Sequence, residues 1–228
     1  MTAPDGPPEL AEGLALIFDM DGVLVDSNPA HREAWIAYNR GFGLDTTEEM
    51  LERMYGRRND QIIRDYYGAD LTEEEVVRRG ADKEKLYRSM IASRLDGMLV
   101  PGLRPFLARY RGTPMAVASN AEPENVNFLL DQAGLRPFFR VVVDGSQVNR
   151  PKPDPEIYLK VAEWLKTAPE NAIVFEDSLS GVEAARAAGM RVIGISTTLG
   201  NLPGTIICVD NFLSKDLQTW LATQMRAV

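Results

Sequence analysis

Two aspartates stand two positions apart in the segment DMDGVLVDS, directly after the short apolar run LALIF. At the end of an extended strand, this spacing points the side chains of Asp19 and Asp21 to the same side, and Gly22 then permits a tight turn. Two neighbouring carboxylates can divide a reaction between them if their surroundings separate their pKa values. We therefore expect Asp19 to act as an ionised nucleophile and Asp21 to donate and accept protons. The same spacing also occurs in surface turns, so other segments must support this interpretation.

Polar residues also follow later apolar runs. Ser119 and Asn120 come after MAVA, and Glu176 and Asp177 come after AIVF. A hydroxyl and free backbone N–H groups just before a helix that begins at Pro123 form a site for an anion such as phosphate. Two acids at the end of a strand form a site for a divalent cation, and oxygen ligands of this kind suit Mg²⁺. Helix capping by Ser119 or Asp177 is the alternative interpretation.

Lys152 lies in the segment RPKPDPEIY, where a proline flanks it on each side. The prolines restrict the backbone and so hold the base of the lysine side chain in place. An ammonium group that reaches the carboxylates would neutralise charge on a phosphoryl group during its transfer. A solvated loop lysine is the alternative, but so rigid a setting is less usual for one.

Six short apolar runs are the elements that would position these residues. They cover residues 14–18, 115–118, 141–143, 172–175, 192–195 and 206–209. Each is too short for a helix and suits a strand buried on both faces, as in a parallel sheet. Helical patterns separate most of them, as in the segment after Asp154, where Ile157, Val161 and Trp164 share one face. This alternation predicts an α/β fold with a doubly wound parallel sheet.

The polar residues that follow these runs should line one cleft, because ligands of such sheets bind beyond the carboxyl ends of the strands. Several carboxylates in one cleft repel each other unless a cation joins them. The sequence therefore predicts a Mg²⁺ site there, with Asp19, Asp21, Glu176 and Asp177 as its candidate ligands.

Residues 28–97 interrupt the alternation with helical patterns and contain no convincing strand. Thr46 with Glu49, and Thr72 with Glu75, have the spacing of capping boxes at helix starts. The insert therefore predicts an α-helical cap just after the first strand. The predicted domains are a mobile N-terminal tail at 1–12, a core domain at 13–27 and 98–228, and the helical cap at 28–97.

The composition limits the partners and the compartment. A chain of 228 residues with 45% hydrophobic and 25% charged residues is typical of a globular protein with a sizeable core. Its net charge of −8 argues against nucleic acid or an anionic membrane as a partner. A single cysteine, Cys208, excludes an intramolecular disulfide and indicates a reducing compartment. With no signal peptide or membrane span, we predict a cytoplasmic monomer or small homo-oligomer that acts on a small phosphorylated metabolite.

The order and spacing of these segments resemble the four motifs of the haloacid dehalogenase-like superfamily. The motifs are D-x-D-G-V-x-x-D-S, a strand that ends in Ser119, K-P-x-P around Lys152, and E-D-S-x-x-G from Glu176. The resemblance spans residues 14 to about 210, nearly the whole chain. The helical insert resembles the α-helical cap of the branch that contains phosphoglycolate phosphatases, sugar-phosphate phosphatases and β-phosphoglucomutase.

The resemblance implies a Rossmann-like core and a role for each acidic motif residue. Asp19 matches the family nucleophile and a metal ligand. Asp21 matches the general acid/base, with its backbone carbonyl also on Mg²⁺. Glu176 and Asp177 match the acidic pair that holds the metal directly or through water.

The resemblance also implies how the phosphate is held. Ser119 matches the phosphate-binding hydroxyl, and Lys152 matches the lysine of the third motif. In this family, an acid at the position of Asp21 accompanies phosphate-ester chemistry.

His31 leaves two activities open. The segment DSNPAHREAW resembles the part of β-phosphoglucomutase in which a histidine helps to position the acid/base. Many phosphatases of the same branch also carry this histidine. His31 could instead be a solvated residue on the first helix of the cap.

Two other positions differ from the mutase. That family has an arginine three residues after a glycine of the cap, which grips the second phosphate, whereas here Gly56 is followed by Arg57, Arg58 and Asn59. It also has a lysine three residues beyond the second-motif serine, where this chain has Glu122. The loss of two cationic contacts makes it harder to hold two phosphates. Arg57 or Arg58 could substitute as a ligand of the substrate, or be an exposed residue of the cap.

The prediction is therefore a Mg²⁺-dependent phosphatase that hydrolyses a small phosphate monoester, a sugar phosphate or a phosphoglycolate-like compound, through an aspartyl-phosphate. A β-phosphoglucomutase-type mutase is the alternative. A non-catalytic binding protein is less favoured, because the residues that catalysis requires are all present.

Overall fold

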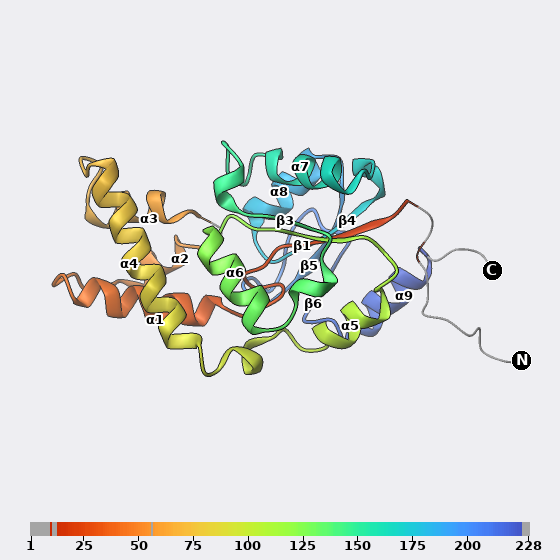
Figure 1. Ribbon diagram of the computed structural model, residues 1–228, viewed down its shortest axis with the longest axis horizontal. Coiled ribbons are helices and arrows are strands. Elements are labelled where there is room, and N and C mark those ends of the chain that lie inside the picture. Colours follow the sequence, from red (N-terminus) through yellow and green to blue (C-terminus); the bar gives the residue numbers. More distant parts are fainter. Residues whose placement is uncertain (1–9, 11–12, 56, 225–228) are drawn as a thin grey trace, which may run out of the picture.

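A six-stranded parallel sheet forms the centre of the computed structural model, which describes residues 10, 13–55 and 57–224 (Figure 1). The strands are β1 (Ala15–Phe18), β2 (Met115–Ala118), β3 (Val141–Val143), β4 (Ala172–Glu176), β5 (Arg191–Ile195) and β6 (Ile207–Val209). Their spatial order is β3-β2-β1-β4-β5-β6, and each neighbouring pair is parallel. All six predicted runs form strands, which confirms the doubly wound parallel sheet.

Helices cover both faces of this sheet (Figure 1). They are α5 (Leu103–Arg109), α6 (Pro123–Gln132) and α9 (Lys215–Ala222) on one face, and α7 (Glu156–Leu165) and α8 (Leu179–Ala187) on the other. Leu16 and Phe18 of β1 pack toward α5, α6 and α9, whereas Ile17 packs toward α7 and α8. Alternate side chains of a strand point to opposite faces, so β1 is buried on both and is apolar throughout.

The chain changes direction in the sheet at β1. It places β2 and β3 on one side of β1 and then crosses to place β4, β5 and β6 on the other. Phe18 pairs with Phe175 of β4, and their rings stack with centroids 4.8 Å apart. Ligands of doubly wound sheets bind at the carboxyl ends of strands that flank such a reversal. Asp19 follows one of these strands and Glu176 ends the other, so the fold brings both acids to that place.

The helices of the predicted cap lie beyond the carboxyl ends of the strands (Figure 1). They are α1 (Asn28–Arg40), α2 (Glu48–Glu52), α3 (Asn59–Tyr67) and α4 (Glu73–Ile91). Trp35, Leu51, Ile63 and Val76 belong to an apolar cluster of the cap itself. Short 3₁₀ helices cover Leu95–Met98, Arg136–Phe138, Gly145–Gln147 and Pro169–Asn171. Within the described part of 28–97, no segment forms a strand.

The chain enters and leaves the cap through two segments that lie side by side. Asp26 N donates to Met98 O at 2.8 Å, and Val100 N donates to Leu24 O at 3.1 Å. Val25 forms an antiparallel bridge with Leu99 between them. The predicted limits of the cap fall next to this paired segment.

Several predicted helix starts agree with the structure, and one is displaced. Thr72 and Glu75 form the predicted capping box of α4. The cap of α2 is Thr47, whose side chain accepts from Met50 N, so the prediction of Thr46 is wrong by one residue. The hydroxyl of Thr46 instead accepts a hydrogen bond from Asn39, a buried residue that needs a partner.

Two further expectations concern single residues. The helical pattern puts Trp164 on one apolar face with Ile157 and Val161, which would bury all three in the core, but Trp164 is 45% exposed, so this expectation is wrong for Trp164. It lies at the last turn of α7, where the Nζ of Lys160 is 5.3 Å from the centre of its ring. Of the predicted tail at 1–12, the structure describes only Leu10, which is buried against the core. No helix of the described chain has the length and apolar character to cross a bilayer.

Candidate active site

A pocket of about 720 Å³ lies between the carboxyl ends of the strands and the helices of the cap. It is lined by the predicted site residues Asp19, Asp21, His31, Arg57, Arg58, Ser119, Asn120, Lys152 and Asp177. Glu176 is the predicted site residue that lies outside this lining, because it is buried behind Lys152. Segments that are far apart in the sequence therefore converge on one cavity, as the strand-end argument predicts.

The turn after β1 positions the first aspartate. Asp19 N donates to Phe175 O at 3.0 Å, which continues the pairing of β1 with β4 by one residue. Gly22 has a φ of +79°, and a Cβ at this position would lie 1.9 Å from Oδ2 of Asp177. Only glycine permits the turn to approach that carboxylate so closely. Asp19 is left 7% exposed at the floor of the pocket.

Lys152 joins the acids of two strands. Its Nζ donates to Oδ1 of Asp19 and to Oε1 of Glu176, both at 2.6 Å, and to Ala118 O at 3.0 Å. The side chain is 6% exposed. Burial alone would lower the pKa of Lys152, but the charges of Asp19 and Glu176 outweigh it and raise this pKa well above its ordinary value. The lysine is therefore a fixed positive charge at the floor of the pocket.

Glu176 supports this lysine from behind. Its Oε1 also accepts from the Tyr158 hydroxyl at 2.7 Å. Its Oε2 accepts from Asp177 N at 3.0 Å and from the N and Oγ of Ser178 at 3.1 and 3.0 Å. Both carboxylate oxygens of Glu176 thus accept several hydrogen bonds. These bonds fix the position of the negative charge that pairs with Lys152.

The first turn of α8 packs directly on Glu176, and this contact makes Gly181→Ala a test of the arrangement. A Cβ at position 181 would lie 1.8 Å from Oε1 of Glu176, so the carboxylate or the helix must move. We expect the substitution to lower the free energy of unfolding by at least about 2 kcal/mol, measured by urea denaturation. Gly97→Ala is the control, because a Cβ there meets no atom within 4 Å. Equal stability of the two variants would contradict the packing argument.

Asp177 completes a group of three buried acids. Ligand oxygens of Asp19, Glu176 and Asp177 all lie within 4.8 Å of one another. Asn28 Nδ2 donates to Oδ2 of Asp177 at 3.2 Å, and the hydroxyl of Thr198 donates to the same oxygen. Burial, followed by the charges of Glu176 and Asp19, raises the pKa of Asp177 well above its ordinary value.

Burial also raises the pKa of Asp19 to about 8, although Lys152 opposes the rise. Three buried carboxylates lie around one ammonium group, so ionisation of all three leaves an excess of negative charge that a divalent cation would offset. The donors are all oxygen atoms, as Mg²⁺ prefers. The residues of this site therefore fit a magnesium ion, with Asp19 and Asp177 facing the pocket. The carboxylate of Asp21 is not part of this group.

Ser119 and Asn120 lie at the carboxyl end of β2, just before α6. Ser119 N donates to Val143 O at 3.0 Å, and its Oγ accepts from Ala121 N at 3.1 Å. Because that oxygen acts as an acceptor, its own proton can point to an anion in the pocket. Oδ1 of Asn120 accepts from Lys152 N at 3.3 Å and so ties the second and third motifs together.

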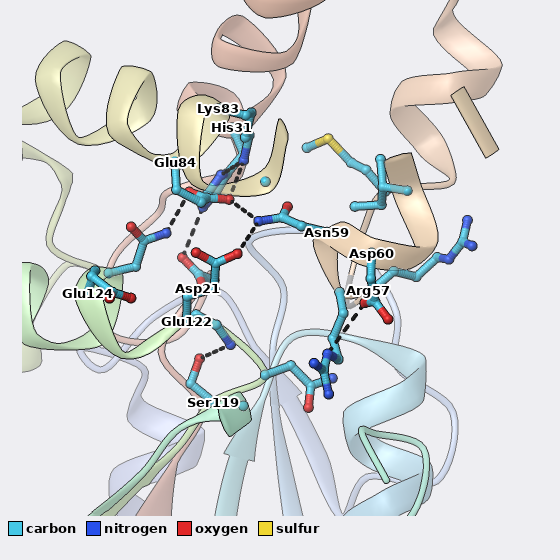
Figure 2. Close-up of a pocket in the computed structure, with 18 of the residues that line it drawn as sticks. Asp21, His31, Arg57, Asn59, Asp60, Lys83, Glu84, Ser119, Glu122 and Glu124 are labelled. Carbon is cyan, nitrogen blue, oxygen red and sulfur yellow. Dashed lines mark hydrogen bonds and ion pairs between the residues drawn. The ribbon is translucent and has the colours of Figure 1, made fainter. Parts of the chain in front are cut away.

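Asp21 faces the cap rather than the acid cluster (Figure 2). Its Oδ1 accepts from Ser27 Oγ at 2.5 Å and lies 3.5 Å from Nε2 of His31. Burial acts to raise the pKa of Asp21, but His31 and Ser27 outweigh it and hold this pKa below its ordinary value. The two aspartates that are adjacent in the motif therefore have pKa values shifted in opposite directions.

Two charged residues of α4, which the sequence analysis missed, complete the surroundings of His31. Lys83 Nζ lies 2.8 Å from Nδ1 of His31 and donates to Oε1 of Glu84 at 2.8 Å. The ring of His31 stacks on Tyr87 with centroids 3.7 Å apart. A signal was present, because Lys83 lies seven residues after Val76 on the buried stripe of α4. His31 is therefore held inside the cap–core contact rather than solvated.

Glu84 predicts a difference in acid stability. Burial acts to raise the pKa of Glu84, but Lys83 and His31 outweigh it and lower this pKa to about 2 from 4.5. The ionised carboxylate thus stabilises the fold above pH 4.5, and this contribution is lost as the pH falls toward 2. Between about pH 5 and about pH 3, we expect the wild type to lose about 2 kcal/mol more free energy of unfolding than Glu84→Gln. Urea denaturation at both pH values measures this difference.

The control for this comparison is Glu163→Gln, since Glu163 is exposed on α7. That variant is expected to lose the same free energy as the wild type over the same pH interval. If Glu84→Gln also followed the wild type, the ionised Glu84 would not contribute to acid stability.

Arg57 and Arg58 line the outer part of the pocket, where each is paired with an acid of the cap. Arg57 donates to Asp65 at 2.6 Å, and Nε of Arg58 lies 3.4 Å from Asp60. About a third of each arginine side chain is exposed. These pairs neutralise part of the positive charge that the sequence alone suggested for substrate binding.

The side-chain amide of Asn59 links the cap to the core. Asn59, the first residue of α3, donates its Nδ2 to Glu84 Oε1 at 2.8 Å and to Glu122 Oε1 at 3.0 Å (Figure 2). Glu84 Oε2 accepts from Asn125 Nδ2 at 2.6 Å. Sequence reasoning singled out Asn59 and Glu122 separately, and the structure places them in contact.

Comparison with known proteins supports the motif assignment. Residues 14–189 match the haloacid dehalogenase-like hydrolase family. A phosphorylated carbohydrates phosphatase of Thermotoga maritima is 34% identical over 194 residues, which are 82% of this chain and 87% of that protein. A fructose-1-phosphate phosphatase of Escherichia coli is 34% identical over 184 residues, which are 79% of this chain and 95% of that protein.

A solved structure shows the same arrangement of core and cap. The crystal structure of β-phosphoglucomutase from Clostridium difficile has a TM-score of 0.81 and 26% sequence identity, and the match covers 92% of this chain and 96% of that one. The family model covers more than half of the chain, and two relatives exceed 30% identity over most of it. The chain therefore belongs to the haloacid dehalogenase-like hydrolases, the family that its motifs predict.

Proposed function

We propose that the protein is a Mg²⁺-dependent phosphatase that hydrolyses the phosphate monoester of a small sugar-like metabolite in the cytoplasm. The observation that carries this proposal is the contact of Lys152 with both Asp19 and Glu176, next to Asp177, at the floor of a pocket. A nucleophile, a fixed cation and a set of oxygen ligands at one point are what transfer of a phosphoryl group requires. The similarity to two sugar-phosphate phosphatases supports the same assignment.

In the first step, a carboxylate oxygen of Asp19 attacks phosphorus as the bond from phosphorus to the leaving oxygen breaks. Lys152 offsets negative charge on the transferring group, while Ser119 and the backbone before α6 bind its oxygens. Bound Mg²⁺, held by Asp19 and Asp177 with the backbone of Asp21, would supply further positive charge opposite the phosphoryl oxygens. Glu176 holds Lys152 and the start of α8 in place.

In the second step, water attacks the aspartyl-phosphate and releases phosphate, which regenerates Asp19. Asp21 donates a proton to the leaving oxygen in the first step and takes one from the attacking water in the second. Its lowered pKa suits the second of these roles. The proton taken from water serves the next first step, and His31, whose Nε2 lies 3.5 Å from Oδ1 of Asp21, would hold this carboxyl group in position. Closure of the cap excludes bulk water from the intermediate.

A β-phosphoglucomutase-type activity is the second candidate. The similarity to the mutase structure and the position of His31 beside Asp21 favour it. The residues at the two positions that would bind a second phosphate, Asn59 and Glu122, argue against it because neither is cationic. We therefore place the phosphatase first.

The deciding experiment is a panel of phosphorylated sugars and small organic phosphates incubated with the purified protein and Mg²⁺. We expect release of inorganic phosphate without isomerisation of the substrate. Conversion of β-glucose 1-phosphate into glucose 6-phosphate, primed by a bisphosphate, would establish the mutase instead. Neither product, in a protein that still binds Mg²⁺, would favour a non-catalytic binding protein.

Removal of divalent cations is expected to abolish phosphate release, and added Mg²⁺ is expected to restore it. Asp177→Asn should raise the Mg²⁺ concentration that gives half-maximal activity by at least about tenfold, because it removes a negative ligand. Asp216→Asn, which changes an exposed acid of α9, should leave that concentration unchanged. Full activity in the presence of a chelator would contradict the metal requirement.

A further inference from the structure

Asn59 and Glu122 form one of the contacts between the cap and the core. Asn59 begins α3, and Glu122 is the N-terminal capping residue of α6. The side-chain hydrogen bond between them is 3.0 Å long (Figure 2). A Cβ at Gly80 of α4 would lie 3.4 Å from the same carboxylate oxygen, so Glu122 packs closely against the cap. Two positions 63 residues apart in the sequence therefore act as one structural unit.

The side-chain oxygens left over in this unit are hydrogen-bond acceptors. Nδ2 of Asn59 is engaged with Glu84 and Glu122. The atoms that remain are Oδ1 of Asn59 and Oε2 of Glu122, which have no hydrogen-bond partner among residues 10, 13–55 and 57–224. Both residues line the pocket. Acceptors without a proton of their own bind hydroxyl groups, which donate, and repel anions, which do not.

The charge around this unit is negative. Burial raises the pKa of Glu122 above its ordinary value, and the nearby charges of Glu84 and Glu124 raise it further, while Asn59 opposes the rise. Lys83, a buried cation whose charge reaches Glu122, is already paired with Glu84 at 2.8 Å. An anionic group placed here would meet the carboxylates of Glu84, Glu122 and Glu124.

The unit also lies near Asp21, in the same pocket. Glu84, which accepts a hydrogen bond from Asn59 at 2.8 Å, is close enough for its charge to act on both Asp21 and Glu122. Asp21 is the group proposed to protonate the leaving oxygen. The part of the substrate that departs with that oxygen therefore extends toward Asn59 and Glu122.

From these observations, and resting on the proposed phosphatase activity, we propose that Asn59 and Glu122 determine specificity for the leaving group. They bind hydroxyl groups of an uncharged polyol or sugar and exclude a leaving group that carries a carboxylate or a second phosphate at that end. The substrate class is then a monophosphate of a neutral polyhydroxy compound. If the pair only held the cap against the core, its substitution would affect every substrate equally. If it determines specificity, substitution would affect charged and uncharged leaving groups differently.

Two substrates of equal length test the proposal. Sorbitol 6-phosphate and 6-phosphogluconate differ at the end far from the phosphate, where one has a hydroxymethyl group and the other a carboxylate. We expect the wild type to have a kcat/KM at least about tenfold higher for sorbitol 6-phosphate, since like charges a few ångströms apart repel by more than 1 kcal/mol in a partly buried site. Phosphate release with Mg²⁺ measures both values.

The decisive variant is Glu122→Gln, which removes the charge and keeps an acceptor for Asn59. It is expected to reduce the preference about tenfold, mainly by raising kcat/KM for 6-phosphogluconate. Glu122→Leu removes the acceptor as well and should also lower kcat/KM for sorbitol 6-phosphate. Glu163→Gln, which removes a charge from an exposed position of α7 outside the pocket, should leave the preference of the wild type unchanged.

The outcomes separate the inference from the activity on which it rests. Hydrolysis of both substrates with a preference that Glu122→Gln leaves unchanged would overturn the specificity role while the phosphatase stands. An equal loss for both substrates in Glu122→Gln would overturn it in favour of a fastening role. No phosphate release from either substrate or from p-nitrophenyl phosphate would overturn the phosphatase and the inference together.

Discussion

Asp19→Asn is expected to lower the rate of phosphate release by at least about 10⁴-fold. An amide oxygen is too weak a nucleophile to attack phosphorus, and Glu176 cannot replace Asp19 because both of its carboxylate oxygens already accept hydrogen bonds. Asp21 faces His31 on the other side of the turn. The measurement is kcat with a saturating phosphate monoester and excess Mg²⁺. A rate within tenfold of the wild type would exclude Asp19 as the nucleophile.

The same variant should remain folded. The raised pKa of Asp19, about 8, means that its ionised form opposes folding at neutral pH in the absence of a cation. A neutral asparagine relieves this opposition, so the metal-free variant should melt at or above the temperature of the metal-free wild type. Asp216→Asn is the control, because Asp216 is an exposed acid on α9, away from the acid cluster. It should keep both the turnover and the melting temperature of the wild type.

Lys152→Met is expected to affect activity and stability together. The substitution removes the charge that stabilises the transferring phosphoryl group, which should lower kcat by about 10³-fold. It also leaves the buried carboxylates of Asp19 and Glu176 without their shared partner. Breaking a buried ion pair on one side destabilises a protein by about 3 kcal/mol or more. Enzyme kinetics and urea denaturation without metal measure the two effects.

A double variant separates these effects. Lys152→Met combined with Glu176→Gln removes both charges, so part of the lost free energy of unfolding should return while the activity stays low. Lys215→Met is the control, since Lys215 is exposed at the start of α9. If Lys152→Met were as stable as that control, the contacts of Lys152 with the two acids would not hold the fold together.

The strands and their polar ends were predictable from the sequence alone. Runs such as Met115–Ala118 are apolar at every position because both faces of the sheet are covered, and this pattern separates them from half-exposed strands. Once the strands are parallel and doubly wound, the position of Asp19 near Glu176 follows from topology. The order of the motifs along the chain therefore predicted that their polar residues meet at the carboxyl edge of the sheet.

Contacts between the cap and the core were not predictable in the same way. Lys83 and Glu84 lie in a strongly charged helix, and a charge on a helix is usually solvated. Their burial depends on where α4 sits against α1 and α6, and local pattern does not encode that distance. The burial of Trp164 was mispredicted for a related reason. A periodic pattern shows which face of a helix points to the core, but not how far the core extends along that helix.

The segments that enter and leave the cap run next to each other, with Val25 bridged to Leu99. An insertion whose two ends already adjoin adds almost no chain-closure entropy to the domain that hosts it. Its length and sequence can thus drift, or be exchanged for another helical segment, without displacing the strand that carries Asp19. Exchange of the cap can in this way give one reaction centre different substrates during evolution. Protein engineers can use the same pair of adjoining segments to join a different cap to this core.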